Sequence, residues 1–396
     1  MPVSEMLRQN CLALLAGCCI LVAEPLFAQQ PRAQQPSAQS QKPVAQKSPE
    51  KAPAARDPRI GTKVLITQAG AELKTPDATV WRAYLGEVFT VTLTNGEWLW
   101  IDEKGGWLWD KQTIPYSTAV NEVSKRIQKT PTAENFHLRG VALLAHREYD
   151  RAIADFSESL KREPKNAGAL NNRGQCHYLK QNYSEAIRDF SAALKLDPKN
   201  FLARNNRSLA YIAAKDYKNA MADLQVALQQ VPEYPEALNN RGVVNQKLGK
   251  LDESIRDFTA ALKIDPKYTD ALGNRAHTYR LKGDFSKAVA DLEKAIALRP
   301  NTYEAINDLA WLLSTAKEDQ FRNRERALKL AQQACEISEY KQWNTLDTLA
   351  AAYAENGNFD EAATWVSKSL ELAPASEKPR IETHQKLIAA KQPFRE

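Results

Sequence analysis

Small, aromatic and apolar side chains return at a fixed interval through the second part of the chain. From Ala133 onward the same residue types recur every 34 residues, at four phases occupied by glycine, an aromatic residue, alanine and phenylalanine. Each of the first five units closes on a proline: Pro164, Pro198, Pro232, Pro266 and Pro300. A fixed period of this length predicts an array of one repeated structural unit.

The residues at these phases resemble one family of repeats. They are Gly140, Gly174 and Gly242; Tyr149, Tyr183, Tyr217 and Phe285; Ala152, Ala186, Ala220 and Ala288; and Phe156, Phe190 and Phe258. Their order resembles the tetratricopeptide repeat (TPR), a helix-turn-helix unit of this length. The resemblance implies a mainly α fold, a right-handed α-solenoid of TPR helical hairpins, whose curved surface binds partners and carries no chemistry of its own.

The period also sets the limits of the array. It predicts seven TPR units over residues 133–374, beginning at Ala133, Ala167, Phe201, Pro235, Thr269, Tyr303 and Trp343. The sixth unit has 40 residues, and its surplus falls near 317–324, where it must lengthen the turn between two helices. Residues 117–132 are expected to form an N-terminal capping half-repeat. An amphipathic helix within 375–396 is expected to cap the other end.

Before the array, polar and apolar residues alternate with the period of a β-strand. Segments 63–67, 87–93 and 97–101 are predicted strands, and Asn95-Gly96 is a strong hairpin signal between the last two. Gly105-Gly106 predicts a further turn before Trp107-Leu108-Trp109. A short all-β unit ending in a Gly-Trp strand resembles bacterial SH3-like domains, so residues 58–116 are expected to form a small SH3-like barrel.

The third of these strands carries two tryptophans on one face. Trp98 and Trp100 alternate with Leu99 and Ile101, so the indoles point away from the aliphatic pair. If the aliphatic pair lines the barrel core, the indoles form an SH3-like surface that would bind cell-wall material or a protein segment. In the other interpretation, they cover the open edge of the barrel or pack on the first helix of the array.

The N-terminus has the pattern of an export signal. Arg8 precedes an apolar run, and Leu26-Phe27-Ala28 suits cleavage before Gln29, which predicts a signal peptide over residues 1–28. Leu15-Ala16-Gly17-Cys18 also resembles a bacterial lipobox, in which Cys18 would carry a lipid. The expected location is therefore periplasmic or secreted, with lipid anchoring to the cell envelope as the alternative. Residues 29–57 are rich in Gln, Pro, Ala and Lys and are expected to form a disordered linker.

Five units pair an arginine with an aspartate sixteen residues later. The arginines occupy the seventh position and the aspartates the twenty-third: Arg139 and Asp155, Arg173 and Asp189, Arg207 and Asp223, Arg241 and Asp257, and Arg275 and Asp291. Units six and seven lose both charges together, with Leu309 and Leu330 in one and Leu349 and Trp365 in the other. Joint loss predicts a structural contact between the two helices of a hairpin, since one abandoned partner would be costly.

Candidate binding residues are asparagines on the first helix of each unit, which lines the concave groove in this family. Positions 2, 5, 6, 9 and 13 of that helix share one face, here named the groove stripe. Asparagine occupies its sixth position at Asn172, Asn206, Asn240 and Asn274, and its fifth at Asn171, Asn205, Asn239 and Asn307. The sixth-position residues resemble those that hold extended peptides in the TPR superhelix of O-GlcNAc transferase. The alternative is that the amides bond neighbouring helices.

Charge on the groove stripe narrows the class of partner. Its second position holds Glu236, Asp270 and Glu304 in successive units, and its fifth position has no Lys or Arg. Such a groove would repel an acidic tail and favours a neutral or basic peptide. The net charge of +6 is spread among acidic residues, which argues against nucleic acid as a partner.

No arrangement of residues predicts catalysis. The sequence lacks phosphate-loop, zinc-protease, serine-hydrolase and Cys-x-x-Cys motifs, so no enzyme activity, cofactor or metal is expected. Cys176 and Cys335 are expected to be buried and unpaired. The sequence therefore predicts a non-catalytic interaction scaffold of the cell envelope that binds a partner protein or peptide in the groove. The alternative function is envelope attachment through the SH3-like domain, and membrane contact is expected only through a lipid anchor.

Overall fold

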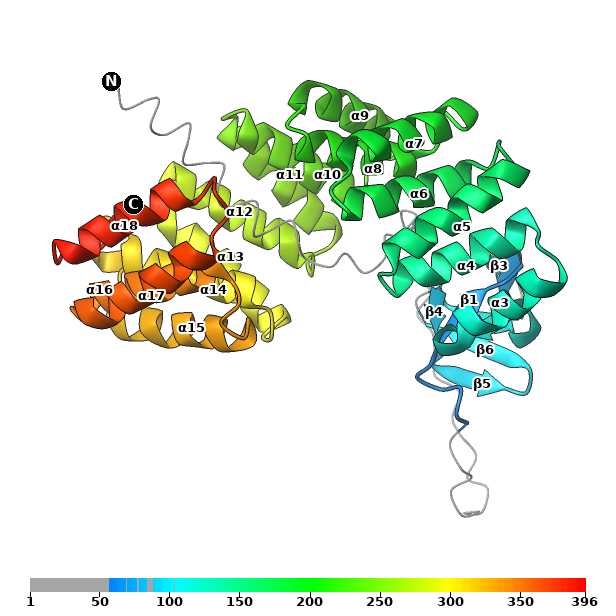
Figure 1. The fold of residues 1–396 in the computed structure, drawn as a ribbon, viewed down its shortest axis with the longest axis horizontal. Coiled ribbons are helices and arrows are strands. Elements are labelled where there is room, and N and C mark those ends of the chain that lie inside the picture. The colour runs from blue at the N-terminus through cyan, green and yellow to red at the C-terminus, as the bar shows by residue number, and fades with distance from the viewer. Residues whose placement is uncertain (1–56, 69, 77, 84–87, 103) are drawn as a thin grey trace, which may run out of the picture. The chain divides into compact units, whose positions relative to one another are not determined.

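A computed structural model describes residues 57–396, apart from residues 69, 77, 84–87 and 103. The signal peptide, the lipobox at Cys18 and nearly all of the linker lie outside the described residues. The chain divides into two compact units, which meet between Val231 and Pro232 and are described separately below. Helices dominate both units, and a β region precedes them (Figure 1), which confirms the predicted fold class.

The β region contains two antiparallel sheets. The smaller sheet has the strand order β4-β1-β8, and the larger has the order β3-β2-β7-β6-β5. The strands are β1 (Lys63–Ile66), β2 (Ala71–Lys74), β3 (Thr79–Ala83), β4 (Val88–Thr90), β5 (Leu93–Asn95), β6 (Trp98–Ile101), β7 (Gly106–Trp109) and β8 (Thr113–Pro115).

The predicted single strand over 87–93 is wrong. Val88–Thr90 pairs with β1 in the smaller sheet, whereas Leu93–Asn95 pairs with β6 in the larger one. The chain changes sheets between the two strands, and Val91 remains fully buried at this corner. The hairpin at Asn95-Gly96 is present as predicted, with Asn95 opposite Trp98 and Gly96 at a φ of 62°.

The β region packs on the first helices of the same unit. Leu99, Ile101 and Leu108 are fully buried in the core of the β region. Leu65 and Ile114 belong instead to the helical core that contains Val123 and Leu138. The smaller sheet therefore joins the larger sheet to the start of the helical array.

Helices begin at every residue where the 34-residue period starts a unit. The first unit contains α3 (Ala119–Lys129), α4 (Ala133–Ala145), α5 (Tyr149–Arg162), α6 (Ala167–Leu179), α7 (Tyr183–Leu196), α8 (Phe201–Ala213) and α9 (Tyr217–Gln230). The second contains α10 (Pro235–Lys247), α11 (Leu251–Ile264), α12 (Thr269–Lys282), α13 (Phe285–Leu298), α14 (Tyr303–Thr315), α15 (Arg324–Ile337), α16 (Trp343–Glu355), α17 (Phe359–Leu372) and α18 (Lys378–Ala389).

The two helices of a hairpin approach closely where glycine faces phenylalanine. A Cβ added at Gly242 would lie 2.6 Å from Cε1 of Phe258, and the glycines of the first two hairpins meet Phe156 and Phe190 in the same way. The third and fifth hairpins carry a Cβ at the glycine position, and leucine replaces the phenylalanine: Ser208 with Leu224, and Ala276 with Leu292. The glycine is therefore retained to make room for a ring.

We expect Gly242→Ala to destabilise the protein by about 1–3 kcal/mol, because the new methyl group overlaps the buried Phe258 ring. Gly273→Ala is the matched control, since a Cβ there meets nothing within 4 Å. Removing a glycine from α12 should leave stability unchanged or raise it by up to about 1 kcal/mol. Urea unfolding followed by circular dichroism measures both changes. Equal midpoints for the two variants would contradict the explanation.

The surplus residues of the sixth hairpin are anchored to a buried glutamate. Glu355 is 4% exposed, and its carboxylate contacts Arg322 at 3.3 Å, Arg324 at 3.3 Å and Arg395 at 2.6 Å. Arg322 also donates to the carbonyl oxygens of Ala316 and Lys317. The lengthened turn is thus held by ion pairs and hydrogen bonds.

After α18 the chain returns to α14 through residues 393–396, here named the return segment. Phe394 is 2% exposed and stacks on His384 with ring centroids 4.2 Å apart. The backbone N–H of Glu396 donates to the carbonyl oxygen of Thr315 at 2.9 Å, and its side chain pairs with Arg280. The return segment therefore contacts α12, α14 and α18 and, through Arg395 and Glu355, also α16.

Both cysteines of the described residues are buried and unpaired, as predicted. Burial raises the pKa of the Cys176 thiol to about 12 and that of Cys335 to about 11, so both are poor nucleophiles. Within the described part of the chain, no helix combines the length and the apolar character needed to cross a membrane.

Candidate functional site

The five predicted arginine–aspartate pairs are all present. In the third hairpin, Arg207 Nε and Nη2 each donate to one oxygen of Asp223 at 2.7 Å, and the same forked contact joins Arg139 to Asp155, Arg173 to Asp189, and Arg275 to Asp291. Arg241 reaches Asp257 at 2.6 Å. In four hairpins the arginine also donates to a hydroxyl of the preceding second helix: Ser124, Ser157, Ser191 or Thr259. These arginines are structural.

The sixth and seventh hairpins replace the ion pair with an apolar contact. Leu309 is fully buried, and Leu330 packs against the same cluster. Leu349 is 1% exposed, and Trp365 packs against its cluster. The structure thus contains both solutions at one position, which agrees with the joint loss of charge in the sequence.

In the first compact unit, which ends at Val231, the candidate asparagines form hydrogen bonds between neighbouring helices. Asn206 Nδ2 donates to Asn171 Oδ1 at 3.2 Å, from the sixth position of one hairpin to the fifth position of the hairpin before. Asn172 makes the equivalent contact with His137 Nε2 at 3.4 Å and also accepts a hydrogen bond from Asn171 at 3.3 Å. Asn205 is fully buried and Asn206 is 6% exposed. The alternative interpretation of the asparagines therefore describes their observed contacts.

The second compact unit, which begins at Pro232, has the same contact between α12 and α10 but not between α14 and α12. Asn274 Nδ2 donates to Asn239 Oδ1 at 3.0 Å, and Asn239 donates to Asn240 at 3.4 Å. One hairpin further on, the sixth position is Asp308 and the fifth position facing it is Gly273, so neither side chain can continue the series. The row of paired amides, here named the asparagine ladder, stops at α14.

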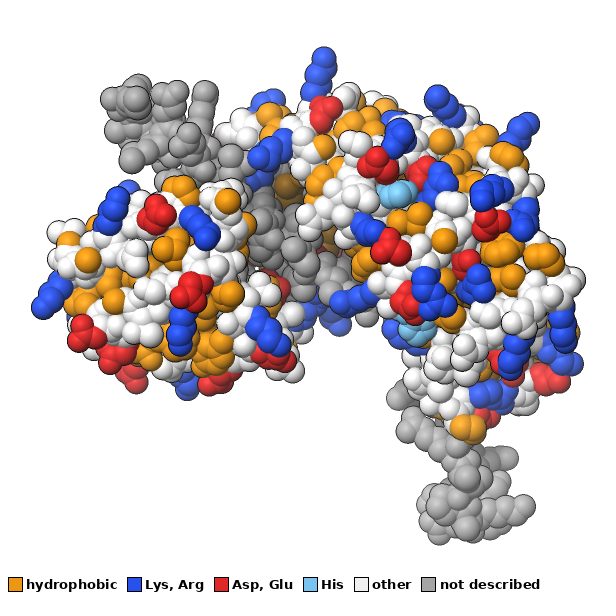
Figure 2. Space-filling view, viewed as in Figure 1, with side chains coloured by type: hydrophobic (Ala, Val, Ile, Leu, Met, Phe, Trp, Pro, Cys, Tyr) orange, Lys and Arg blue, Asp and Glu red, His pale blue; other side chains and the backbone are white. Residues whose placement is uncertain are grey.

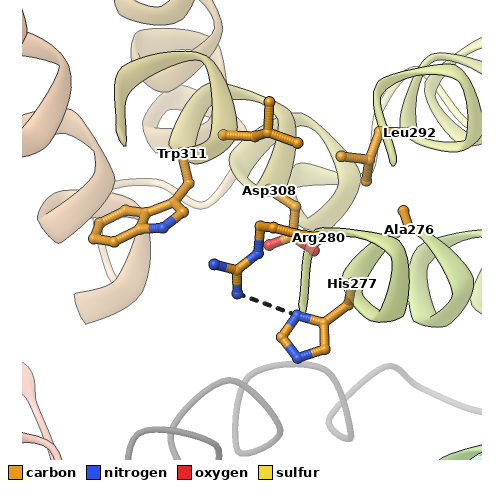
Figure 3. Close-up of a pocket in the computed structure, with 7 residues that line it drawn as sticks. Ala276, His277, Arg280, Leu292, Asp308 and Trp311 are labelled. Carbon is orange, nitrogen blue, oxygen red and sulfur yellow. Dashed lines mark hydrogen bonds between the residues drawn. The ribbon is translucent and has the colours of Figure 1, made fainter. Parts of the chain in front are cut away.

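A cavity lies where the asparagine ladder stops. His277 and Arg280 from α12 and Asp308 and Trp311 from α14 converge on it, as Figure 3 shows. Arg280 donates to His277 Nδ1 at 3.3 Å and pairs with Glu396. Trp311 Nε1 donates to the same Glu396 carboxylate at 2.9 Å. By their positions in the sequence, His277, Asp308 and Trp311 fall on the groove stripe, whereas Arg280 does not. Arg280, Asp308 and Trp311 were not among the predicted binding residues.

The surroundings of this cavity lower the pKa of its histidine, His277, and raise the pKa of its carboxyl group, Asp308. Burial, Arg280 and Lys247 hold the pKa of His277 well below its usual value. Burial raises the pKa of Asp308 to about 6, although Arg280 acts in the opposite direction. At neutral pH Asp308 is therefore an anion in a half-buried site, and His277 adds no positive charge to balance it.

A second candidate surface lies on the larger sheet. In the register of β6 and β7, Trp98 pairs with Trp109 and Trp100 with Trp107, so four tryptophans share one face. Trp98 is 41% and Trp109 37% exposed, while Trp100 and Trp107 contact each other edge to face at 5.2 Å. The sequence singled out Trp98 and Trp100. Their partners on β7 required knowledge of the register.

On the visible face, basic and acidic side chains are interspersed (Figure 2). Among the described residues, no group of His, Cys, Asp and Glu is arranged to hold a metal ion. His137 is buried beside Phe156, and burial lowers its pKa to about 4. His384 is bonded to Asp347 at 2.9 Å and packs under Phe394. These two histidines have structural contacts.

Family models of the tetratricopeptide repeat match residues 137–200, 180–235, 235–268, 269–302 and 345–376. The chain therefore belongs to the TPR proteins. TPR repeats bind proteins or peptides and are generally non-catalytic, so the chain is a protein-interaction scaffold.

Solved structures that match with TM-scores above 0.5 share the fold. The Cut9–Hcn1 hetero-tetramer of the APC/C matches with a TM-score of 0.53 and 18% identity over 60% of this chain and 47% of that chain. Yeast Tom70 matches with a TM-score of 0.51 and 18% identity over 70% of this chain and 59% of its own. YrrB, described as a TPR protein with an unusual peptide-binding site, is 27% identical over 48% of this chain and 98% of its own, with a TM-score of 0.38. No curated protein sequence matches the chain.

Proposed function

We propose that the chain is an exported scaffold of the cell envelope whose groove stripe holds an extended segment of a partner protein. The observation that carries this proposal is the asparagine ladder, which fixes the orientation of carboxamides along the first helices. Asn206 and Asn274 each use one N–H in the ladder, and a carboxamide has a second N–H and a carbonyl oxygen left for a peptide backbone. Recognition of the backbone is independent of partner side chains.

The proposed location depends on the sequence of residues 1–57. The predicted signal peptide would direct export, and the linker would separate the folded units from the envelope surface. Lipidation of Cys18 would attach the protein to a membrane and remains the alternative route to the same compartment.

Affinity capture tests the groove. The Asn206→Ala/Asn240→Ala variant is expected to lose partners that the wild type retains, because the asparagine ladder no longer presents its amides. Asn182→Ala/Asn301→Ala is the matched control, since both of these asparagines are exposed. Thermal unfolding must show that the test variant is folded. Retention of every partner by the folded test variant would overturn the role of the ladder.

A second function is favoured by the tryptophan face. Exposed Trp98 and Trp109 would give the SH3-like domain an aromatic surface for cell-wall material, which would make the array secondary. The same capture experiment separates the two functions when purified envelope is included as bait. Sedimentation lost from Trp98→Ala/Trp109→Ala, but kept by the asparagine variant, would favour attachment through the β region.

A further inference from the structure

The first helix of the sixth hairpin carries two buried side-chain oxygens, on Glu304 and Asn307, that accept no hydrogen bond. Glu304, Asn307 and Asp308 lie on one face of α14, at spacings of three and four residues, together with Trp311 of the cavity. Asn307 is 4% exposed, and its Oδ1 accepts no hydrogen bond; the same is true of the buried Oε2 of Glu304. Buried oxygens of this kind are normally paired with a donor.

The end of the asparagine ladder explains why Asn307 Oδ1 has no hydrogen-bond donor. Elsewhere the sixth-position amide of the next hairpin donates to the fifth-position oxygen, as Asn274 does to Asn239. The seventh hairpin has Thr348 at that position, and its hydroxyl donates to the carbonyl oxygen of Asn344 within its own helix. Asn307 therefore has no ladder donor, and Asp308 faces Gly273 in place of an amide.

The neighbouring cation, Arg280, acts on Asp308 only through its charge, because its hydrogen bonds go to other residues. Arg280 is 15% exposed, and its guanidinium is committed to Glu396 and to His277. Figure 3 shows the Arg280 side chain beside Asp308 in the cavity, with its bond directed to His277. Glu304 and Asp308 repel each other, and burial raises the pKa of both. The face thus offers two carboxyl groups and one amide oxygen to an incoming donor.

We propose that Glu304, Asn307 and Asp308 form a cation subsite that takes a Lys or Arg side chain from the bound partner segment. An ammonium or guanidinium group is both a donor and a positive charge: it can donate to Asn307 Oδ1 and Glu304 Oε2, which lack a donor, and it can balance the charge of Asp308, whose carboxyl group already accepts a hydrogen bond from Asn307. Asp270, at the second position of the preceding first helix, adds a further carboxylate on the groove stripe, and its contact with Arg299 is long, at 3.9 Å. This inference rests on the proposed peptide-binding function and specifies the partner's charge.

Selection from a library of random twelve-residue peptides displayed on phage tests the subsite with the full chain as bait. Three baits are compared: the wild type, Glu304→Gln/Asp308→Asn, and the control Glu371→Gln, whose glutamate is exposed on α17. We expect the wild type and the control to enrich peptides with a shared Lys or Arg. The double variant keeps the shape of the subsite but not its charge, so it should lose this enrichment.

The best peptide is then synthesised and its Kd measured by fluorescence anisotropy. Glu304→Gln/Asp308→Asn should weaken binding at least about tenfold, as should replacement of the shared Lys or Arg by Gln, since each removes one side of a partly buried ion pair. The two changes should not add. Acetylating the peptide's N-terminus should have no effect; if acetylation alone abolishes binding, the cation is an α-amine and the assignment to a side chain is wrong.

Different failures have different meanings. The selected peptides could lack Lys and Arg and bind the wild type and Glu304→Gln/Asp308→Asn equally. If the Asn206→Ala/Asn240→Ala variant also fails to bind these peptides, the subsite is overturned but the groove function is supported. If the wild type retains no peptide, both the subsite and the groove function are overturned. Circular dichroism of each bait excludes loss of folding as the cause, and the isosteric substitutions make such loss unexpected.

Discussion

Replacing Arg275 with leucine should destabilise the second unit by roughly 3–5 kcal/mol, while replacing both Arg275 and Asp291 with leucine should recover most of that loss. The single change leaves the Asp291 carboxylate, which is 10% exposed, without the two 2.7 Å hydrogen bonds that hold it. The double change recreates the apolar contact that the next hairpin already makes with Leu309 and Leu330. The apolar pair of the sixth hairpin therefore shows that this position can be filled by two leucines without an ion pair.

Urea unfolding of the full chain gives the overall effect, and native-state hydrogen exchange in α12 and α13 locates it, because repeat arrays can unfold in parts. Arg256→Leu/Glu253→Leu is the control, since this pair on α11 is exposed and 3.2 Å apart. Its loss should cost no more than about 0.5 kcal/mol. Equal destabilisation by the single and the double change at Arg275 and Asp291 would refute the coupling.

Phe394→Ala should release the return segment from the second unit. Truncating a phenylalanine that is 2% exposed removes about 3–5 kcal/mol of packing free energy. This loss is comparable with the free energy that can keep a four-residue segment bound to the helices. Release would also separate Arg395 from Glu355 and Glu396 from Arg280. The cost to the rest of the unit should be smaller, because the segment can detach without opening the helices.

Hydrogen exchange at the Glu396 N–H, which donates to Thr315, measures the release directly. Trp311 fluorescence should change as well, since the indole loses its bond to Glu396. Gln392→Ala is the control, because that side chain is exposed and one residue outside the segment. Protection of the Glu396 N–H that survives in Phe394→Ala would show that the polar contacts hold the segment unaided.

Sequence periodicity predicted the helices well because each position of a hairpin meets the same neighbours in every unit. The pairing of Arg207 with Asp223 could be inferred since both positions change together in later units. The strand over 87–93 was mispredicted for a related reason: alternation continues through Val91, although the chain there passes from one sheet to the other. Alternation reports which face a residue occupies and does not identify the sheet.

The site depended on contacts that periodicity does not contain. Asp308 and Arg280 are ordinary charged residues in the sequence, and their meeting requires the spacing between α12 and α14. The contact of Arg395 with Glu355 joins an irregular segment to a helix. The sequence contained one signal: Glu355 follows the apolar run from Leu349 to Ala354, where an acidic side chain needs a partner if it is buried.

The hydroxyl contacts of the arginines bear on how this array changes length. In four hairpins the same guanidinium closes its own hairpin and reaches back to the hairpin before or to α3, so these four junctions use the same connector. A unit bounded by such connectors can be duplicated or deleted without redesigning its borders. The last two hairpins have Leu309 and Leu349 in place of the arginine and are joined through Glu355 and the lengthened turn. Duplication of units is therefore expected upstream of α14. Such a duplication would leave the separation between the proposed cation subsite on α14 and the final helix, α18, unchanged.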